Sequence, residues 1–103
     1  MFAAQERAEL TRELSRLYPD TDSIRRIART VDVQTEQIDM DGAALNVWSA
    51  VVYEAYLRGH GYLGRLVQVP ITEGRASDEI YRLYTLWQSN EVFLSRIQPG
   101  TPQ

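Results

Sequence analysis

The 103-residue chain contains no cysteine and no lysine, and its only histidine is His60. Without cysteine it can form no disulfide, no thiol nucleophile and no zinc site built on thiolates. Without lysine it can form neither a Schiff base nor the lysine contact of a P-loop. The residues around His60 fit no metal-binding or catalytic-triad spacing, so we expect an exposed loop or capping residue. We therefore predict a protein that is not an enzyme, with no catalytic residue, cofactor or metal ligand.

Long apolar segments are missing too, because no run reaches the roughly 18 residues of a membrane-spanning helix. Residues 1–16 are interspersed with Glu and Arg, which is unlike a signal peptide. We therefore expect a cytoplasmic protein with no membrane partner. The net charge of −3 also makes nucleic acid an unfavourable partner, because that affinity comes mainly from neutralising phosphates.

The composition that remains is typical of one globular domain, with 44% hydrophobic and 24% charged residues. A chain of this length can build one hydrophobic core but not two. We predict a single helical domain over residues 1–97. Residues 98–103, with the sequence QPGTPQ, are expected to be a flexible tail or a linker.

Apolar residues recur at the spacing of amphipathic helices along most of the chain. The first predicted helix spans Ala3–Leu17 and is ended by Pro19. Residues 43–58 are apolar on most sides, which is typical of a central helix, and we expect Trp48 to be buried there. A second predicted helix follows a cap at Asp20 or Thr21, and two short ones span residues 35–39 and 62–69. The last predicted helix begins after Ser77 and ends near Trp87 or at Ile97. The predicted fold class is all-α, a compact antiparallel bundle of five or six helices.

Residues 59–64, Gly-His-Gly-Tyr-Leu-Gly, match the GxGxxG pattern of dinucleotide-binding proteins. That pattern binds pyrophosphate when it lies between a strand and a helix of a βαβ unit. Here it follows a predicted helix, and no strand is predicted anywhere in the chain. We interpret these glycines as the end of the central helix.

Charges of opposite sign are segregated within residues 25–41. Three arginines share one face of the second predicted helix: Arg25, Arg26 and Arg29. Four carboxylates follow them: Asp32, Glu36, Asp39 and Asp41, the last also the predicted N-cap of the central helix. Their spacing does not fit an EF-hand, which leaves a solvated surface or an acidic docking patch. Two surfaces of opposite sign on one molecule are what head-to-tail self-association uses.

Tyr53 and Leu57 fall on the less buried side of the predicted central helix. They either cover a neighbouring helix or act as exposed anchors of an interface. Tyr53 joins the seven charged residues as a candidate protein-interaction residue.

A helix-turn-helix is the alternative interpretation of residues 24–38, IRRIARTVDVQTEQI. Its second helix would enter the major groove, where Gln34 and Gln37 could contact bases. Glu36 and Asp39 would then lie among residues facing the phosphates. DNA binding is therefore the alternative function rather than the first.

Several short segments together resemble a known family. They are residues 14–19 (LSRLYP), residues 23–28 (SIRRIA), Ile38-Asp39, and residues 46–48 (NVW) with Ala55 seven positions on, followed by a glycine and a leucine-rich helix. Over roughly residues 8–83 the chain resembles the bacterial effector-associated domains of type one. These are small helical adaptors compared with the death-domain superfamily.

The resemblance implies a death-fold-like bundle that associates with like domains, in itself or in sensor and effector proteins of bacterial conflict and defence systems. The effectors of that family include proteases and nucleotide-dependent regulators. Our first hypothesis is accordingly a non-catalytic adaptor. In the contact that we expect, the arginine face of one domain meets the carboxylates of another, which includes a second copy in a homo-oligomer.

Overall fold

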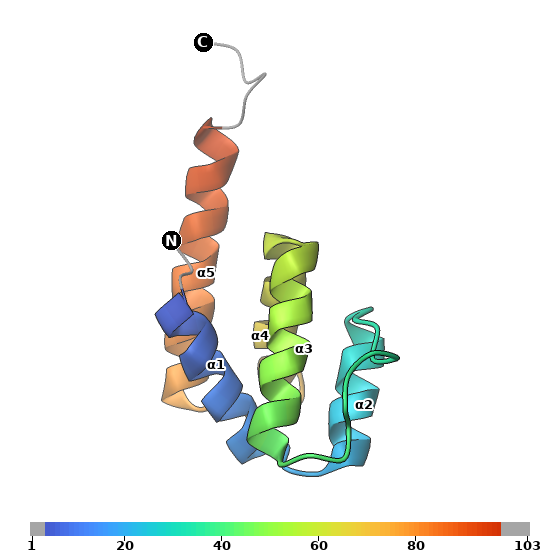
Figure 1. The fold of residues 1–103 in the computed structure, drawn as a ribbon. Coiled ribbons are helices and arrows are strands. Elements are labelled where there is room, and N and C mark those ends of the chain that lie inside the picture. Colours follow the sequence, from blue (N-terminus) through green and yellow to red (C-terminus); the bar gives the residue numbers. More distant parts are fainter. Residues whose placement is uncertain (1–3, 98–103) are drawn as a thin grey trace.

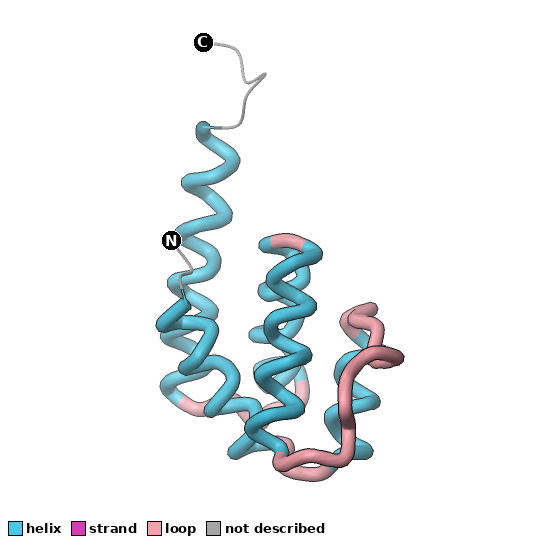
Figure 2. The backbone as a smooth tube through the Cα atoms, in the orientation of Figure 1, coloured by secondary structure: helices cyan, strands magenta, loops and turns pink. Residues whose placement is uncertain are grey.

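Five helices make up the part of the chain that the computed structural model describes, which is residues 4–97 with side chains through residue 89. They are α1 (Ala4–Leu17), α2 (Thr21–Thr30), α3 (Ala44–Arg58), α4 (His60–Thr72) and α5 (Asp78–Ile97). No strand occurs in these residues, and the predicted all-α bundle is confirmed (Figures 1 and 2). The C-terminal half of α5 extends beyond the ends of the other helices (Figure 1).

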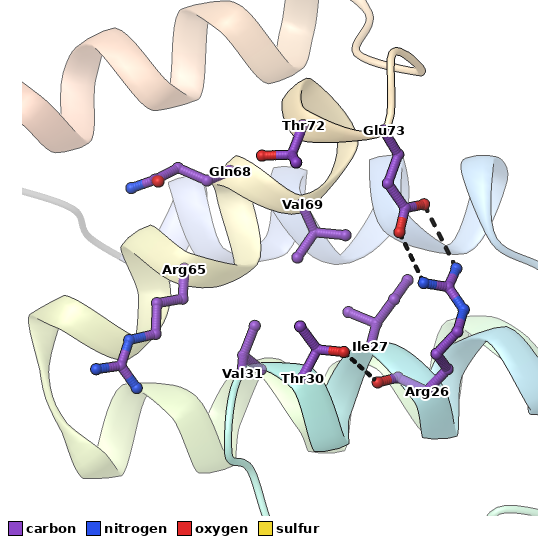
Figure 3. A pocket seen from close by; sticks show the side chains of 9 residues that line it. All are labelled: Arg26, Ile27, Thr30, Val31, Arg65, Gln68, Val69, Thr72 and Glu73. Atoms are coloured by element: carbon purple, nitrogen blue, oxygen red, sulfur yellow. Dashed lines mark hydrogen bonds and ion pairs between the residues drawn. The ribbon is translucent and has the colours of Figure 1, made fainter.

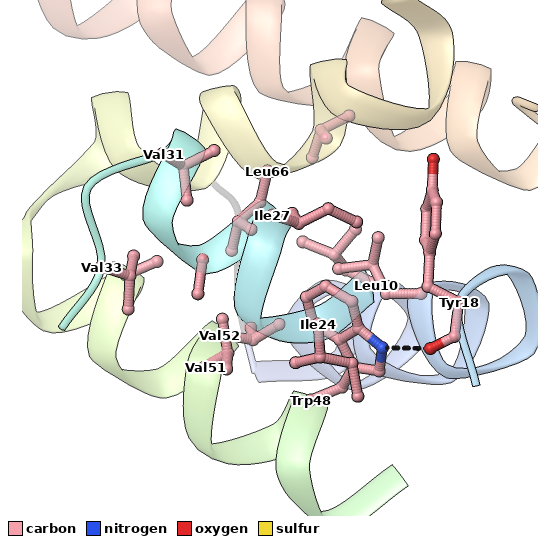
Figure 4. Close-up of a cluster of buried hydrophobic side chains, with 14 of the residues drawn as sticks. Leu10, Tyr18, Ile24, Ile27, Val31, Val33, Trp48, Val51, Val52 and Leu66 are labelled. Atoms are coloured by element: carbon pink, nitrogen blue, oxygen red, sulfur yellow. Dashed lines mark hydrogen bonds between the residues drawn. The ribbon is translucent and has the colours of Figure 1, made fainter. Parts of the chain in front are cut away.

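The core is built around α3, which packs against α1, α2 and α4. Its Trp48 is completely buried, as predicted, and the indole Nε1 donates a hydrogen bond to the Tyr18 carbonyl at 2.9 Å (Figure 4). The Tyr18 ring lies 6.3 Å from the indole, centroid to centroid, and is itself buried. This contact fixes the chain directly after α1 against the middle of the bundle.

Helix α5 closes the bundle against α4 and α1. Glu9 of α1 forms an ion pair with Arg82 of α5. Ser77 donates to Glu13 of α1 at 2.7 Å while its oxygen accepts the Ile80 N–H at 3.3 Å, so the predicted cap of the last helix is confirmed. Helix α5 continues to Ile97, the later of its two predicted ends.

Three local predictions about residues 35–43 and 60–72 are wrong. Residues 35–39 form a single turn closed by the Ile38 N–H and the Thr35 carbonyl at 3.0 Å, because five residues are too few to sustain a helix. The N-cap of α3 is Ala43, with no side-chain hydrogen bond, so Asp41 does not cap it. Helix α4 also begins earlier and ends later than residues 62–69.

Pro70 lies inside α4 without ending it. A proline removes one intrahelical hydrogen bond, but the ring is buried in the core and thereby contributes packing. The Pro70 carbonyl also accepts the Arg75 N–H at 2.8 Å, which closes the last turn of the helix.

Two of the glycines in residues 59–64 have different structural roles. Gly59, with φ 137°, ends α3 and starts α4, so the predicted helix break is confirmed at this residue. Gly64 lies inside α4 and is covered by the indole of Trp87 from α5. His60 is neither an exposed loop residue nor a cap, because Gly59 is the N-cap of α4 and His60 is its first residue. His60 is half-buried, and its ring stacks on Trp87 at 5.2 Å between centroids.

Candidate protein interaction surface

Four of the predicted interaction residues gather at the C-terminal end of α2. Arg25 and Arg29 lie one helical turn apart on the same face of α2. Together with Asp32 and Glu36 from the following loop, they line one open hollow of about 370 Å³. We call these four residues and this space the charged hollow. The two arginines and these two carboxylates are therefore neighbours on one surface, rather than members of two separate faces.

The side chains of the charged hollow form no ion pair or hydrogen bond with the described residues of the chain. Most other arginines do have such a contact. They pair with carboxylates or lie over aromatic rings: Arg7 on Tyr56, Arg16 on Glu13, Arg26 on Glu73, Arg58 and Arg65 on Tyr62, Arg75 on Tyr18, and Arg82 on Glu9. Arg25 and Arg29 are thus left available for a partner, and their two positive charges lie side by side without an ion pair.

Arg26 points away from the charged hollow, toward the end of α4. Its guanidinium donates to both carboxylate oxygens of Glu73, at 2.7 and 3.4 Å (Figure 3). The hydrogen bond from Arg26 is the main cause that lowers the pKa of Glu73 below its usual range. Arg26 therefore joins α2 to α4 within the molecule, a role that its neighbours Arg25 and Arg29 do not share.

Tyr18 completes this internal network, because its hydroxyl donates to Glu73 at 2.9 Å. Burial of the phenol and, second, this hydrogen bond raise the pKa of Tyr18 to about 12. Beside the Arg26–Glu73 pair, an open groove of about 220 Å³ runs between α2 and α4 (Figure 3). Its walls are mainly apolar, with Ile27 and Val69 facing each other across it.

Asp32 has an unusual backbone conformation, with φ 63°, and it is the only described residue other than glycine with positive φ. It follows the C-cap residue Val31. The Val33 N–H donates to the Ala28 carbonyl at 2.8 Å, and the Asp32 N–H donates to the Arg29 carbonyl at 3.1 Å. This pair of bonds is a Schellman motif, whose left-handed position is usually glycine.

Asp39 and Asp41 lie at the other end of α2, away from the charged hollow. The Thr21 hydroxyl, at the start of α2, contacts the carbonyl of Met40 between them at 3.5 Å. The Asp39 carboxylate accepts the Asp41 N–H at 3.0 Å, which shapes this turn. The acidic stretch predicted as one patch is therefore divided by the course of the loop.

A second exposed surface lies on α3, and Tyr53 is part of it. We call it the α3 face, and its large side chains are Leu45, Tyr53, Tyr56 and Leu57. At 100° per residue these four fall within about 120° of the helix circumference, with no charged residue of α3 among them. Tyr53 is 55% and Leu57 58% exposed. Tyr53 is thus exposed rather than covered by a neighbouring helix.

The contribution of Leu45 and Tyr56 to this surface was missed in the sequence. Their exposure follows from which side of α3 contacts the other helices, and an all-round apolar pattern does not reveal that side. The Tyr53 and Tyr56 rings lie 6.1 Å apart, and Arg7 of α1 stacks 3.8 Å from the Tyr56 ring centroid. A loop hollow formed with Gln37, Ile38 and Glu54 borders the other side of α3.

Within residues 4–89, no three His, Cys, Asp or Glu side chains gather in a way that could hold a metal ion. None of the described helices is both long and apolar enough to cross a membrane. The helix-turn-helix interpretation lacks its second helix, because α2 is followed by loop and turns until α3 begins at Ala44.

No family model matches the chain, and neither the curated proteins nor the solved structures contain a match to it.

Proposed function

We propose that this chain is a non-catalytic adaptor that binds like domains and so couples sensor proteins to effectors in bacterial defence. The observation that carries the proposal is the α3 face. Large apolar side chains exposed together on one face of a small domain are typical of protein interaction sites. Tyrosine and leucine anchors surrounded by polar residues have the composition of an interface core with its rim.

The choice of like domains as partners is supported by the resemblance of residues 8–83 to effector-associated domains. It is also supported by the unpaired charges of both signs in the charged hollow. In this proposal the effector, a protease, a nucleotide-dependent regulator or another enzyme, belongs to the partner. The adaptor contributes only the contact that brings the two proteins together.

Light scattering as a function of concentration tests the association directly. We expect the mass of the wild-type chain to rise with concentration. Tyr53→Glu combined with Leu57→Glu places two buried charges in the contact and should lower the mass at each concentration, because neither carboxylate finds a partner there. The matched control is Tyr81→Glu, since Tyr81 is 49% exposed but lies on α5.

The helical circular dichroism of all variants should equal that of the wild type, because these side chains contribute little to the core. A wild-type chain that stays monomeric at every concentration refutes association between like domains. Equal loss of association in the Tyr81→Glu control would show that the α3 face is not the surface involved.

Coupling itself can be measured with a split reporter enzyme. Each fragment is fused to one copy of the chain, and the two fusions are mixed at a concentration at which the fragments alone do not combine. We expect reporter activity from the wild-type pair and less from the pair that carries Tyr53→Glu and Leu57→Glu. Activity that is the same in both pairs would contradict coupling through the α3 face, and no activity from the wild-type pair would contradict the adaptor role.

A further inference from the structure

Two helices of this protein end in the same hydrogen-bond pattern but with different residues at its left-handed position. At the end of α4, the Arg75 N–H donates to the Pro70 carbonyl at 2.8 Å and the Gly74 N–H to the Ile71 carbonyl at 3.2 Å. Gly74 has φ 73°, close to the 63° of Asp32 at the end of α2. The chain thus uses glycine in one Schellman motif and aspartate in the other.

Aspartate is the less favourable residue for the fold at this position. A Cβ atom disfavours the left-handed conformation, which glycine adopts freely. A carboxylate after the last turn of a helix also meets the negative end of the helix dipole. Asp32 is exposed, and its carboxylate makes no hydrogen bond or ion pair with the described residues that would offset these two costs. Its presence is better explained by a contact outside the molecule.

The order in which the charges of the hollow follow one another along the chain indicates what that contact is. Along the chain the signs run plus, plus, minus, minus, at Arg25, Arg29, Asp32 and Glu36. The spacings are four, three and four residues, and they read the same in both directions. When this order is reversed, every arginine therefore stands opposite a carboxylate.

We propose that a second copy of this chain docks on the charged hollow through a two-fold axis, with the two α2 helices antiparallel. Arg29 of each copy then pairs with Asp32 of the other, and Arg25 of each pairs with Glu36 of the other. The partner is thus defined as a like domain that presents the same hollow. This inference rests on the proposed association of like domains and names the surface and symmetry of one such contact.

Charge complementarity favours this occupant over others. A phosphate group or a nucleic acid would meet two carboxylates beside the arginines, and a cation would meet two guanidinium groups. A copy of the same surface leaves none of the four charges without a partner, as isologous contacts require. Because the hollow is open and polar, the contact should be of modest affinity and sensitive to salt.

Sedimentation equilibrium of the full chain at low and high salt, combined with thermal unfolding, tests this proposal. Asp32→Gly should weaken the dimer by roughly tenfold, because one substitution removes two symmetry-related ion pairs. The same substitution should raise the melting temperature by about 2–6 °C, because it relieves the left-handed strain and the dipole repulsion. Weaker association from a more stable protein is a result that structural damage cannot produce.

Asp32→Asn separates charge from conformation, since asparagine tolerates the left-handed region but carries no charge. It should weaken the dimer to a similar extent, whereas Asp41→Asn, the matched loss of a carboxylate outside the hollow, should not. Arg25→Glu with Arg29→Glu should abolish the contact. Mixing this variant with Asp32→Arg plus Glu36→Arg should restore a heterodimer, because the opposed charges are exchanged.

The outcomes distinguish this inference from the proposed function on which it rests. A wild-type chain that is monomeric at low salt overturns both. Wild-type association that is unaffected by salt and by Asp32→Gly overturns the two-fold contact alone and leaves the α3 face as the binding surface. Failure of the charge-exchanged variants to combine overturns the pairing, and a melting temperature that is unchanged or lowered in Asp32→Gly overturns the strain argument.

Discussion

Substituting Gly64 by alanine should destabilise the bundle, although alanine is the better helix former. A methyl group at Gly64 would overlap the six-membered ring of the Trp87 indole. The indole cannot move aside at low cost. Its Nε1 donates to the His60 carbonyl at 2.8 Å, and its ring stacks on both His60, at 5.2 Å, and Tyr84, at 6.0 Å between centroids.

The expected magnitude follows from two opposing contributions. Overpacking a well-filled contact costs about 1–3 kcal/mol, and loss of the indole hydrogen bond adds roughly 1 kcal/mol where the ring is displaced. Replacing glycine by alanine inside a helix contributes about 0.5–1 kcal/mol in the stabilising direction. Gly64→Ala should therefore lower the free energy of unfolding by about 1–3 kcal/mol, measured by urea denaturation followed by helical circular dichroism.

Gly61→Ala is the matched control, because it lies in the same helix and, apart from the backbone of that helix and the adjacent residues, no atom lies within 4 Å of the added methyl group. This variant should be more stable than the wild type by about 0.5–1 kcal/mol. A second check is Trp87→Phe, whose smaller ring should reduce the cost of Gly64→Ala in a double-mutant cycle. Gly64→Ala with the stability of Gly61→Ala would refute the close packing of α4 against α5.

Three further results are expected. Trp48→Ala should lower the free energy of unfolding by about 3–5 kcal/mol in the same denaturation assay, because a buried indole and its hydrogen bond to the Tyr18 carbonyl are removed. The lowered pKa of Glu73 means that its ionised form stabilises the fold above about pH 4.5, its ordinary pKa, and that this contribution is lost as the pH falls through the lowered value. Glu73→Gln should therefore lower the free energy of unfolding by about 0.5–1.5 kcal/mol at neutral pH. The stability of this variant should also fall less steeply as the pH is lowered below 4.5. In a gel-shift assay with random duplex at low salt we expect no bound DNA, and retardation there would revive the helix-turn-helix alternative.

The helices could be predicted from the sequence where a helix is long enough to show its apolar period. Helix α1 is an example, since Leu10 and Leu14 are both buried as their spacing predicts. Residues 35–39 show the limit, because five residues contain barely more than one period and cannot distinguish a helix from a turn. At Pro70 the local rule predicts an end to the helix, but burial of the ring and the closing bonds outweigh it.

The candidate site was predictable only where the relevant neighbours are near in sequence. Arg25 and Arg29 share a face because they are four residues apart on a helix. Arg26 instead pairs with Glu73, which is 47 residues away in the sequence. No local pattern reveals a pair so far apart. The separation of Asp39 from Asp32 likewise depends on the path of an irregular loop, whose course is set by tertiary contacts rather than by periodicity.

The two proposed surfaces together determine what kind of assembly this domain forms. An isologous contact uses the same surface on both copies and is closed once two copies have joined. A domain with only the charged hollow therefore stops at a dimer, whereas one that also binds through the α3 face can extend into longer chains. Arg25→Glu with Arg29→Glu should then leave only association through the α3 face, which is insensitive to salt. Adding Leu57→Glu to that variant should leave monomers, and a wild-type mass that saturates at the dimer would show that one of the two surfaces does not bind a second copy.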